Sequence, residues 1–274
     1  MVLSIGSGFA SDVSNRYLSR TNSKLGLALA RLAAGRRVLS AKDDAASLAI
    51  GSRLEAENVA QRQAYTNAGQ ASSMLQVADG GMAQVNDMLS RMKSLAVEAG
   101  SGQLSASDRN ALNTEYQSLA SEVDRVAADT DFGGKKLLDG SSTSVSVKVG
   151  GGTSPSDNIS APLGNVSTSA LGISGLDITS ASSANTASNA LTNAIDKVQQ
   201  LRSDNGASSN RLDLASANIA TAIENTEAAR SQLIDLDVAA ASSEASQLKT
   251  QLQAGIYASD QANATKKSLL DLFT

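Results

Sequence analysis

The sequence contains no cysteine and no histidine among its 274 residues. Without cysteine the chain cannot form disulfides, thiolate metal sites or a cysteine nucleophile. Without histidine it lacks the commonest general base and the commonest transition-metal ligand, and a Ser-His-Asp triad cannot be built. These two absences strongly disfavour an enzyme, although carboxylate or lysine chemistry stays open. We expect a protein that is not an enzyme, with no catalytic, metal or cofactor site.

Aromatic residues are scarce, at 3% of the chain, although the apolar content as a whole is 41%. Large aromatics dominate the energetics of compact cores and of small-molecule pockets. Their scarcity disfavours both, and thin seams of Leu, Val, Ile, Met and Ala fit the composition better.

The chain also lacks excess basic charge and long apolar runs. A net charge of −4 disfavours nonspecific binding to nucleic acid. No stretch of about 18 apolar residues is present, so no membrane span is expected. Residues 1–9 lack a basic region followed by an apolar run, which is the pattern of a general secretory signal peptide. Composition alone therefore indicates a cytoplasmic protein.

Most of the sequence follows helical spacing. Apolar residues at steps of three, four and seven predict a helix over residues 4–33, with Gly35 as its stop. A second helix is expected from about residue 43 to residue 99, capped by Ser40 or Asp43. At 1.5 Å per residue it would be on the order of 85 Å long, which exceeds the core of an ordinary domain of this size.

The second half of this helix contains a regular apolar seam, whose steps alternate between three and four residues. Such spacing is typical of a coiled-coil seam that packs between helices of one subunit. The seam consists of Leu75, Ala78, Met82, Val85, Leu89, Met92 and Ala96.

Three further helices are expected. Residues 100–102 break the second helix, and Ser105 or Ser107 begins a third, which ends near residue 129, with Asp108 in its first turn. Helical spacing resumes near Ser183, and a last helix is expected over about residues 239–271.

The middle of the chain, residues 131–178, is the only β candidate. Residues 132–140 read as a turn, a short extended run and a turn, and residues 145–149 alternate as a strand does. The apolar positions of residues 171–178 could be short strands or loop anchors. The sequence thus predicts a mainly α fold: a long antiparallel helical hairpin or coiled-coil bundle with a small β-hairpin region in the middle.

Several stretches together resemble bacterial flagellin. Residues 33–50 contain Ser-Ala-Lys-Asp-Asp-Ala-Ala, which is similar to the core of the family's N-terminal signature. The match covers both helical ends in the family's order. The other matching stretches are residues 91–97, 122–126, 132–138, 210–212, 224–225, 228–237, 261–263 and 269–270.

The resemblance implies a hairpin-shaped filament subunit for motility. Its N- and C-terminal helices would form an inner coiled-coil domain that lines the filament channel, and the longer helices with a β-hairpin would form the next shell. The middle is too short for large outer domains. The expected segments are 1–42 (N-terminal inner part), 43–140 (N-terminal rod part), 141–178 (central β and loop region), 179–231 (C-terminal rod part) and 232–274 (C-terminal inner part).

The resemblance also implies partners and a location. The subunit would polymerise with copies of itself, bind a flagellar export chaperone and meet hook-associated and cap proteins. Export through the flagellar type III apparatus would place it outside the cell and override the cytoplasmic expectation. Candidate inter-subunit residues are Leu18, Leu25, Leu29, Arg36, Asp43, Asp44, Arg91, Leu95, Glu115, Leu248, Leu252, Ile256, Leu269, Leu270 and Phe273.

Two groups of these residues carry specific expectations. Asp43 and Asp44 form either an ion-pair switch with the preceding arginines or a helix cap within a solvated charge cluster. The apolar residues of the C-terminal tail, from Leu248 onward, are expected to stay unburied in a monomer, so both chain ends would order only on assembly or on a chaperone.

The faces around Arg91, Leu95 and Glu115 are expected to be exposed. They resemble the region where flagellin protofilaments pack and which an innate immune receptor reads. Lys93 and Ser94 depart from the receptor-stimulating pattern, which puts recognition in doubt.

Two other functions are compatible with parts of the sequence. A hook–filament junction protein shares the end helices, and a flagellin-like surface protein could bind polysaccharide. The intact Ser-Ala-Lys-Asp-Asp-Ala-Ala motif and the Glu-Val-Asp-Arg stretch at residues 122–125 favour flagellin over the first. The scarcity of aromatics disfavours the sugar stacking that the second would need.

Overall fold

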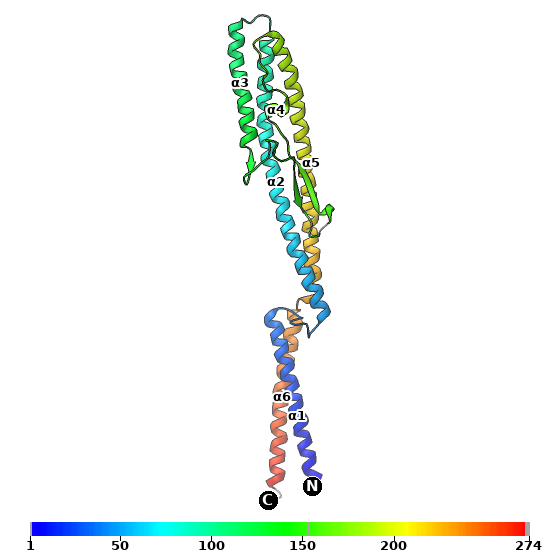
Figure 1. Ribbon diagram of the computed structural model, residues 1–274. Coiled ribbons are helices and arrows are strands. Elements are labelled where there is room, and N and C mark those ends of the chain that lie inside the picture. The colour runs from blue at the N-terminus through cyan, green and yellow to red at the C-terminus, as the bar shows by residue number, and fades with distance from the viewer. Residues whose placement is uncertain (1, 153, 272–274) are drawn as a thin grey trace. The chain divides into compact units, whose positions relative to one another are not determined.

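The computed structural model describes residues 2–152 and 154–271, and gives only the backbone for residues 2–11, 266 and 269–271. The chain forms two compact units. Unit 1 comprises residues 1–56 and 225–274, and unit 2 comprises residues 57–224. The mainly α fold predicted from the sequence is confirmed, and Figure 1 shows its long helices.

Six α-helices account for most of the described chain. Their bounds are α1 Val2–Ala34, α2 Ala45–Ala99, α3 Ala106–Asp129, α4 Thr168–Leu171, α5 Ala181–Ile234 and α6 Val238–Asp271. The helix breaks expected at Gly35 and Gly100 are present. Gly35 has a φ of 64°, a left-handed conformation that glycine adopts without steric cost after a helix.

Helix α3 begins where the sequence predicts, at a Ser105 cap. The Ser105 side chain accepts a hydrogen bond from the Asp108 amide, and the Asp108 carboxylate accepts one from the Ser105 amide. This reciprocal capping box satisfies two backbone donors that have no partner within the helix. The bonds from Ser105 lower the pKa of Asp108 below its ordinary value.

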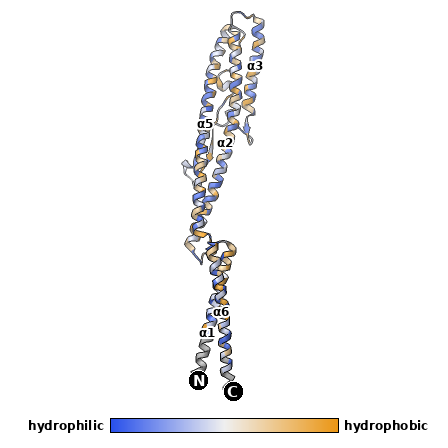
Figure 2. Cartoon of the chain, turned by 180° about the vertical axis from the view of Figure 1, so that it is seen from behind, coloured by the Kyte–Doolittle hydropathy of each residue, from blue (hydrophilic) through white to orange (hydrophobic). Residues whose placement is uncertain are grey.

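Unit 2 is held together by the seam predicted on α2. All seven seam residues, from Leu75 to Ala96, are at most 2% exposed. They face Tyr116, Val123 and Val126 of α3, and Leu191, Val198 and Leu212 of α5, within one apolar core. In Figure 1, α2 lies between α3 and α5 over this region, and Figure 2 shows apolar residues at intervals along all three helices.

Two small antiparallel sheets lie in the middle of the chain. Strands β1 (Asp131–Phe132) and β2 (Lys135–Lys136) form a tight hairpin. Its two turn residues, Gly133 and Gly134, have φ values of 59° and 83°, as a two-residue turn of this hand requires.

The second sheet contains the strand predicted at residues 145–149. It is β3 (Ser144–Lys148), which pairs with β4 (Asn158–Pro162) in the register Val147 opposite Ile159. A short 3-10 helix, η1 (Pro155–Asp157), precedes β4. Both Val147 and Ile159 are buried, so this sheet covers part of the core of unit 2.

Residues 171–178 are loop anchors, and the alternative prediction of strands there is wrong. Leu171 ends α4, while Ile173 and Ile178 are buried from loop positions. Side chains of α3 hold this loop by binding its backbone. Gln117 Nε2 donates to the Leu176 carbonyl at 2.8 Å, and Asn113 Oδ1 accepts from the Ile178 amide at 3.0 Å.

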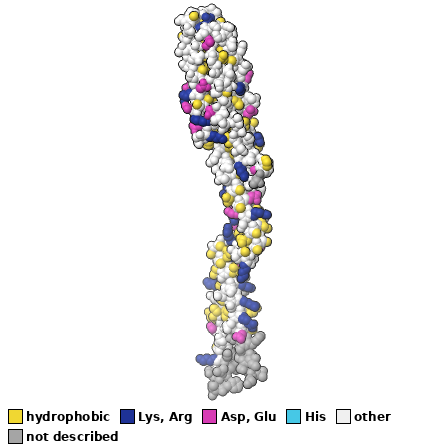
Figure 3. All heavy atoms as spheres, viewed as in Figure 1, with side chains coloured by type: hydrophobic (Ala, Val, Ile, Leu, Met, Phe, Trp, Pro, Cys, Tyr) yellow, Lys and Arg dark blue, Asp and Glu magenta, His cyan; other side chains and the backbone are white. Residues whose placement is uncertain are grey.

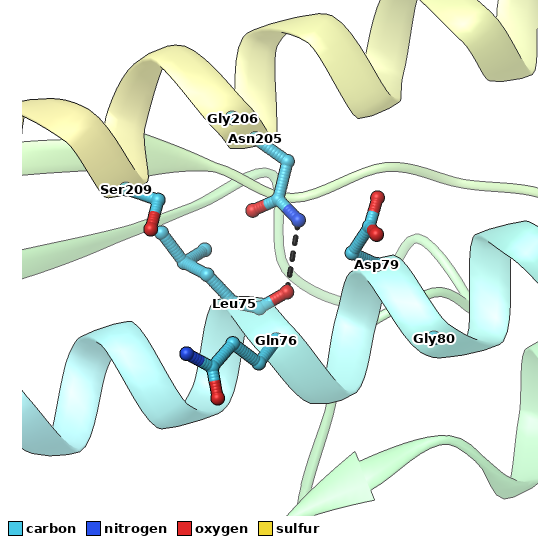
Figure 4. A pocket seen from close by; sticks show the side chains of 7 residues that line it. All are labelled: Leu75, Gln76, Asp79, Gly80, Asn205, Gly206 and Ser209. Atoms are coloured by element: carbon cyan, nitrogen blue, oxygen red, sulfur yellow. Dashed lines mark hydrogen bonds between the residues drawn. The ribbon is translucent and has the colours of Figure 1, made fainter.

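One polar side chain interrupts the apolar contact between α2 and α5. Asn205 is buried, and its Nδ2 donates to the Leu75 carbonyl at 2.8 Å, while its Oδ1 has no hydrogen-bond partner. Figure 4 shows Asn205 reaching from α5 to the α2 backbone. Asn205 also lines a hollow of about 410 Å³. Gly80 and Gly206 line this hollow, and a Cβ added at either would meet no atom within 4 Å.

The adjacent glycines of α2 give a matched stability test. Gly80→Ala is expected to raise the free energy of unfolding by about 1 kcal/mol, because alanine is the better helix former and the site has space. Gly81→Ala is expected to lower it by about 1–3 kcal/mol through overpacking. Its Cβ would lie 2.7 Å from Leu138 Cδ1 and 2.8 Å from Thr130 Oγ1. Urea denaturation of the two variants measures both, and changes of equal sign would contradict the packing described.

Candidate assembly surface

The α1–α6 pair of unit 1 has a small apolar core. The two helices run antiparallel, and Ala28 of α1 is buried against Ala245 and Leu248 of α6. Leu25 and Leu32 pack partly against this cluster. Of the residues whose side chains are described, three make up this core, whereas 32 make up that of unit 2. The pair therefore has far less burial to offset the entropy of ordering two long helices.

The candidate residues of α1 divide between the two sides of this helix. Leu18 and Leu25 are half-buried on the side that faces α6. A Cβ on Gly255 would lie 2.9 Å from Leu18 Cδ2, so the Leu18 side chain packs directly against this glycine of α6. Leu29 is 51% exposed and is available for contact with another molecule.

The candidate residues of α6 require one correction. Leu248 is 8% exposed, so the prediction that no apolar tail residue is buried in the monomer is wrong for this position. The reason is that α1 supplies a partner helix within the same chain. Leu252 is half-buried, and Ile256 is 46% exposed. Candidates nearer the end cannot be assigned a contact. The side chains of Leu269 and Leu270, and the whole of Phe273, lie outside the described residues.

Backbone hydrogen bonds join the two connections that flank this helical pair. The Arg37 amide donates to the Ile234 carbonyl at 2.7 Å, and the Leu236 amide donates to the Gly35 carbonyl at 3.2 Å. Arg36 forms a β-bridge with Asp235. The Arg37 guanidinium donates to the Leu233 carbonyl at 2.7 Å. The segment after α1 and the segment before α6 are thereby held together within unit 1.

Asp44, and not Ser40 or Asp43, caps α2. Its Oδ1 accepts from the Ser47 amide at 2.9 Å, and its Oδ2 accepts from the Ser47 hydroxyl at 2.6 Å. Asp43 instead accepts from the amides of Leu39 and Ser40, at 3.2 and 3.1 Å. Asp43 therefore closes the turn before the helix, which is why the cap falls one residue later than predicted.

These bonds hold the pKa of both carboxyl groups below the ordinary value. The main cause is the Leu39 amide for Asp43 and the Ser47 hydroxyl for Asp44. The ion pair from Arg37 Nη1 to Asp44 Oδ2 is 3.9 Å long and partly exposed, a geometry that contributes little. The principal contacts of these aspartates are therefore local hydrogen bonds, which cap α2 at Asp44 and close the preceding turn at Asp43.

Unit 2 presents an ion pair at the predicted position. Arg91 Nη2 lies 2.7 Å from Glu115 Oε1, and both side chains are largely exposed. Leu95 is 1% exposed, so its predicted place on an exposed face is wrong. Helix α2 packs against both α3 and α5 here, and Leu95 belongs to the widened apolar stripe that two neighbours bury.

Sequence reasoning missed a further group of side chains on α1. Arg16, Arg20 and Lys24 are all exposed, and their spacing of four places them along one side of the helix. This spacing of four residues could have identified the group from the sequence alone. Within residues 2–152 and 154–271, no group of acidic side chains could hold a metal ion, and no helix is long and apolar enough to cross a membrane.

The long helical seams of unit 2 and the helical pair of unit 1 define a mainly helical protein built on long, paired helices. Two family models match the chain. The bacterial flagellin N-terminal helical region matches residues 8–143, and the bacterial flagellin C-terminal helical region matches residues 188–273.

Known flagellins match nearly the whole chain. Flagellin FlaB2 of Treponema pallidum is 32% identical over 273 residues, covering 94% of this chain and 96% of the relative. A flagellin of Listeria monocytogenes is 31% identical, covering 98% of this chain and 99% of the relative. The crystal structure of Bacillus cereus flagellin has 27% identity and a TM-score of 0.50, over 56% of this chain and 88% of that one.

The chain belongs to the bacterial flagellin family. It is a short member, since its length matches these relatives without large central insertions. Members of this family are structural, non-enzymatic subunits that polymerise into the extracellular flagellar filament of motile bacteria. This membership supports the filament subunit over the hook–filament junction protein and over the polysaccharide-binding protein.

The cap of α2 generates a pH prediction. Because its pKa in the folded chain lies below 3.8, the Asp44 carboxylate should protect the Ser47 amide fully above pH 3.8 and lose this effect as pH falls through the lower folded value. Amide exchange of Ser47 measured by NMR checks this. Asp44→Ala should remove the protection at all pH values, whereas Asp44→Asn should keep a cap without the pH dependence. Unchanged exchange in Asp44→Ala would contradict the assignment.

Proposed function

We propose that the α1–α6 pair is the inner assembly layer of the filament and that the rest of the chain forms the shell around it. In this proposal residues 1–42 and 232–274 are the inner segments. The shell consists of the N-terminal rod part (43–140), the central region (141–178) and the C-terminal rod part (179–231). The observation that carries the proposal is the difference between the two apolar cores, which among the side chains that the structure describes contain three buried residues and 32.

Exposed apolar side chains support this role for α1 and α6. Tyr17 and Leu29 of α1 are 70% and 51% exposed, and Tyr257 of α6 is also exposed beside Ile256. A helical pair that leaves such side chains in water gains stability when copies of it pack together. We therefore expect α1 and α6 to be marginal in the monomer and stable in the filament.

The same proposal includes the proteins that would bind the subunit before and after assembly. An export chaperone would cover the C-terminal helix α6 before assembly, and hook-associated and cap proteins would contact the ends of the polymer. Export through the flagellar type III apparatus would deliver the subunit. The pair of Arg91 and Glu115 is available as a protofilament contact, because both side chains are largely exposed.

We also propose that the innate immune receptor for flagellin recognises this chain weakly. Lys93 and Ser94 are exposed or half-exposed beside Arg91, so their departures from the stimulating pattern fall on the accessible side of α2. Buried Leu95 is not available to a receptor in this structure.

The test of the inner layer is seeded polymerisation followed by electron microscopy. The wild-type chain should form filaments. Leu29→Ser and Ile256→Ser should raise the critical concentration about tenfold, because each removes apolar area worth roughly 1–2 kcal/mol at an interface. Gln253→Ser, an exposed polar position on α6, is the matched control and should polymerise as the wild type does.

Two outcomes would contradict this proposal. One is the absence of filaments from the wild-type chain under all seeding conditions. The other is normal assembly of both serine variants, which would mean that these exposed apolar side chains face solvent in the filament as well.

A further inference from the structure

One dipeptide at the contact between α2 and α5 is chemically reactive. Asn205 is followed by Gly206, and it is the one asparagine of the sequence that precedes a glycine. Glycine has no Cβ, so its amide nitrogen can approach the preceding side chain without steric hindrance. In a flexible chain this nitrogen attacks the asparagine carboxamide carbon and forms a five-membered imide. An unfolded chain would therefore lose a side-chain amide most readily at Asn205.

The reaction needs no co-reactant except water. The Gly206 nitrogen loses its proton as it bonds to Asn205 Cγ, and the carboxamide C–N bond breaks, so that ammonia leaves. Water then adds to one of the two imide carbonyls and opens the ring. If the bond between Cγ and the Gly206 nitrogen breaks, the product is aspartate. If the bond from the main-chain carbonyl carbon breaks, the product is isoaspartate, whose side-chain methylene has become part of the main chain.

The structure places this dipeptide inside a long helix. Helix α5 extends on both sides of it, from Ala181 to Ile234. Within a helix the Gly206 amide takes part in the backbone hydrogen-bond ladder, and the rotation about the Asn205 Cα–C bond is fixed at the helical value. Closure of the imide ring requires a free amide nitrogen and a different rotation about this bond. The helix therefore blocks the first step of the reaction.

The Asn205 side chain is also held by α2. It is 5% exposed, and its Nδ2 donates a hydrogen bond to the Leu75 carbonyl at 2.8 Å. Figure 4 shows the carboxamide of Asn205 directed from α5 toward the α2 backbone. The helical conformation of α5 and this bond to α2 must both be lost before the carboxamide can react with Gly206.

Aspartate does not fit this position as asparagine does. A carboxylate cannot donate to the Leu75 carbonyl, and an unpaired charge inside the protein is unfavourable. Arg202, one turn before Asn205, is already paired with Asp79 at 2.9 Å. Figure 3 shows charged side chains of both signs next to one another at the surface of unit 2, where water also solvates them. A carboxylate at the buried position has neither a free cation from Arg202 nor this access to water.

Isoaspartate disrupts α5 more directly. It lengthens the main chain by one atom, so the regular spacing of helical hydrogen bonds is interrupted at Asn205. The buried residues Val198 and Leu212 lie on either side of this point and pack in the same apolar core. A break between them would move one out of register with α2 when the other is in place.

We propose that Asn205 is a deamidation site that the folding of unit 2 protects, and that deamidation of the unfolded chain weakens the contact between α2 and α5 after refolding. A chain that folds promptly keeps Asn205 intact, whereas a chain that stays unfolded is changed irreversibly. The proposal concerns unit 2 alone and does not depend on the inner-layer function of α1 and α6.

Incubation followed by peptide mass spectrometry tests the protection. The full-length chain is held at mildly alkaline pH in native buffer and, in parallel, in urea concentrated enough to unfold unit 2. Conversion at Asn205 should be slower in native buffer by about a hundredfold or more, because it then requires the opening of α5. Equal rates of conversion in the two solutions would overturn the proposal.

Two variants are controls for the chemistry. Gly206→Ala should react several-fold more slowly in urea, because the added methyl group hinders the attacking nitrogen, and a Cβ there would meet no atom within 4 Å of the folded chain. Ser101→Asn creates a second Asn-Gly step, with Gly102, between α2 and α3 and outside both helices. This step should react in native buffer as it does in urea. If it were protected as strongly as Asn205, the helix would not be the cause, and the assignment would be wrong.

Urea denaturation of the refolded material tests the effect on the α2–α5 contact. The chain deamidated in urea should refold with a lower midpoint than the untreated chain, whereas Gly206→Ala treated in the same way should regain its own untreated midpoint. Asn205→Asp, which has the sequence of one product, should also have a lower midpoint. Asn205→Leu should not, since it removes the polar group instead of leaving it unpaired. An unchanged midpoint in both Asn205→Asp and the deamidated chain would contradict the second half of the proposal.

Discussion

The apolar seam of α2 is the contact on which the rest of unit 2 depends. From Leu75 to Ala96 it offers one buried side chain at each step of three or four residues, and α3 and α5 pack against it from two sides. The loops between these helices are fixed by the same core, through Leu138 and Ile178. The close approach at Gly81 shows how little room this packing leaves.

Unit 1 has far fewer buried apolar side chains than unit 2, among the side chains that the structure describes. Its two connections are tied by backbone hydrogen bonds around Gly35 and Arg37, while its long helices α1 and α6 share a core of few small side chains. Long helices with little burial gain their stability from partners and not from propensity. On the proposed inner-layer role, this low burial within the chain leaves the exposed apolar side chains of α1 and α6 available for contacts with neighbouring copies.

Most of the fold could be predicted from the sequence because its strongest signals are local. The steps of the α2 seam, the glycine breaks at Gly35 and Gly100 and the alternating residues of β3 each depend on nearby residues alone. The burial of the candidate assembly residues was harder to predict from the sequence. Leu95 is buried because α2 has two neighbours, and Leu248 is buried because α1 lies beside it. Such facts depend on which helices meet, which helical spacing does not encode.

The residue that caps α2 could not be predicted from local sequence either. Ser40, Asp43 and Asp44 are all good capping residues, and local sequence does not choose among them. The choice is made by the turn before the helix, where Asp43 is already engaged by the amides of Leu39 and Ser40. The spacing of Arg16, Arg20 and Lys24 on α1 is visible in the sequence, but that no ion pair among the described side chains involves them is known only from the three-dimensional arrangement.

The central claim is that α1 and α6 are stabilised by assembly whereas unit 2 is stable alone. Hydrogen exchange of the monomer and of the filament, resolved along the chain, tests it most directly. The account predicts rapid exchange over α1 and α6 in the monomer, strong protection of both in the filament, and strong protection of the α2 seam in both states. Equal protection of α1 and α6 in the monomer and in the filament would contradict it.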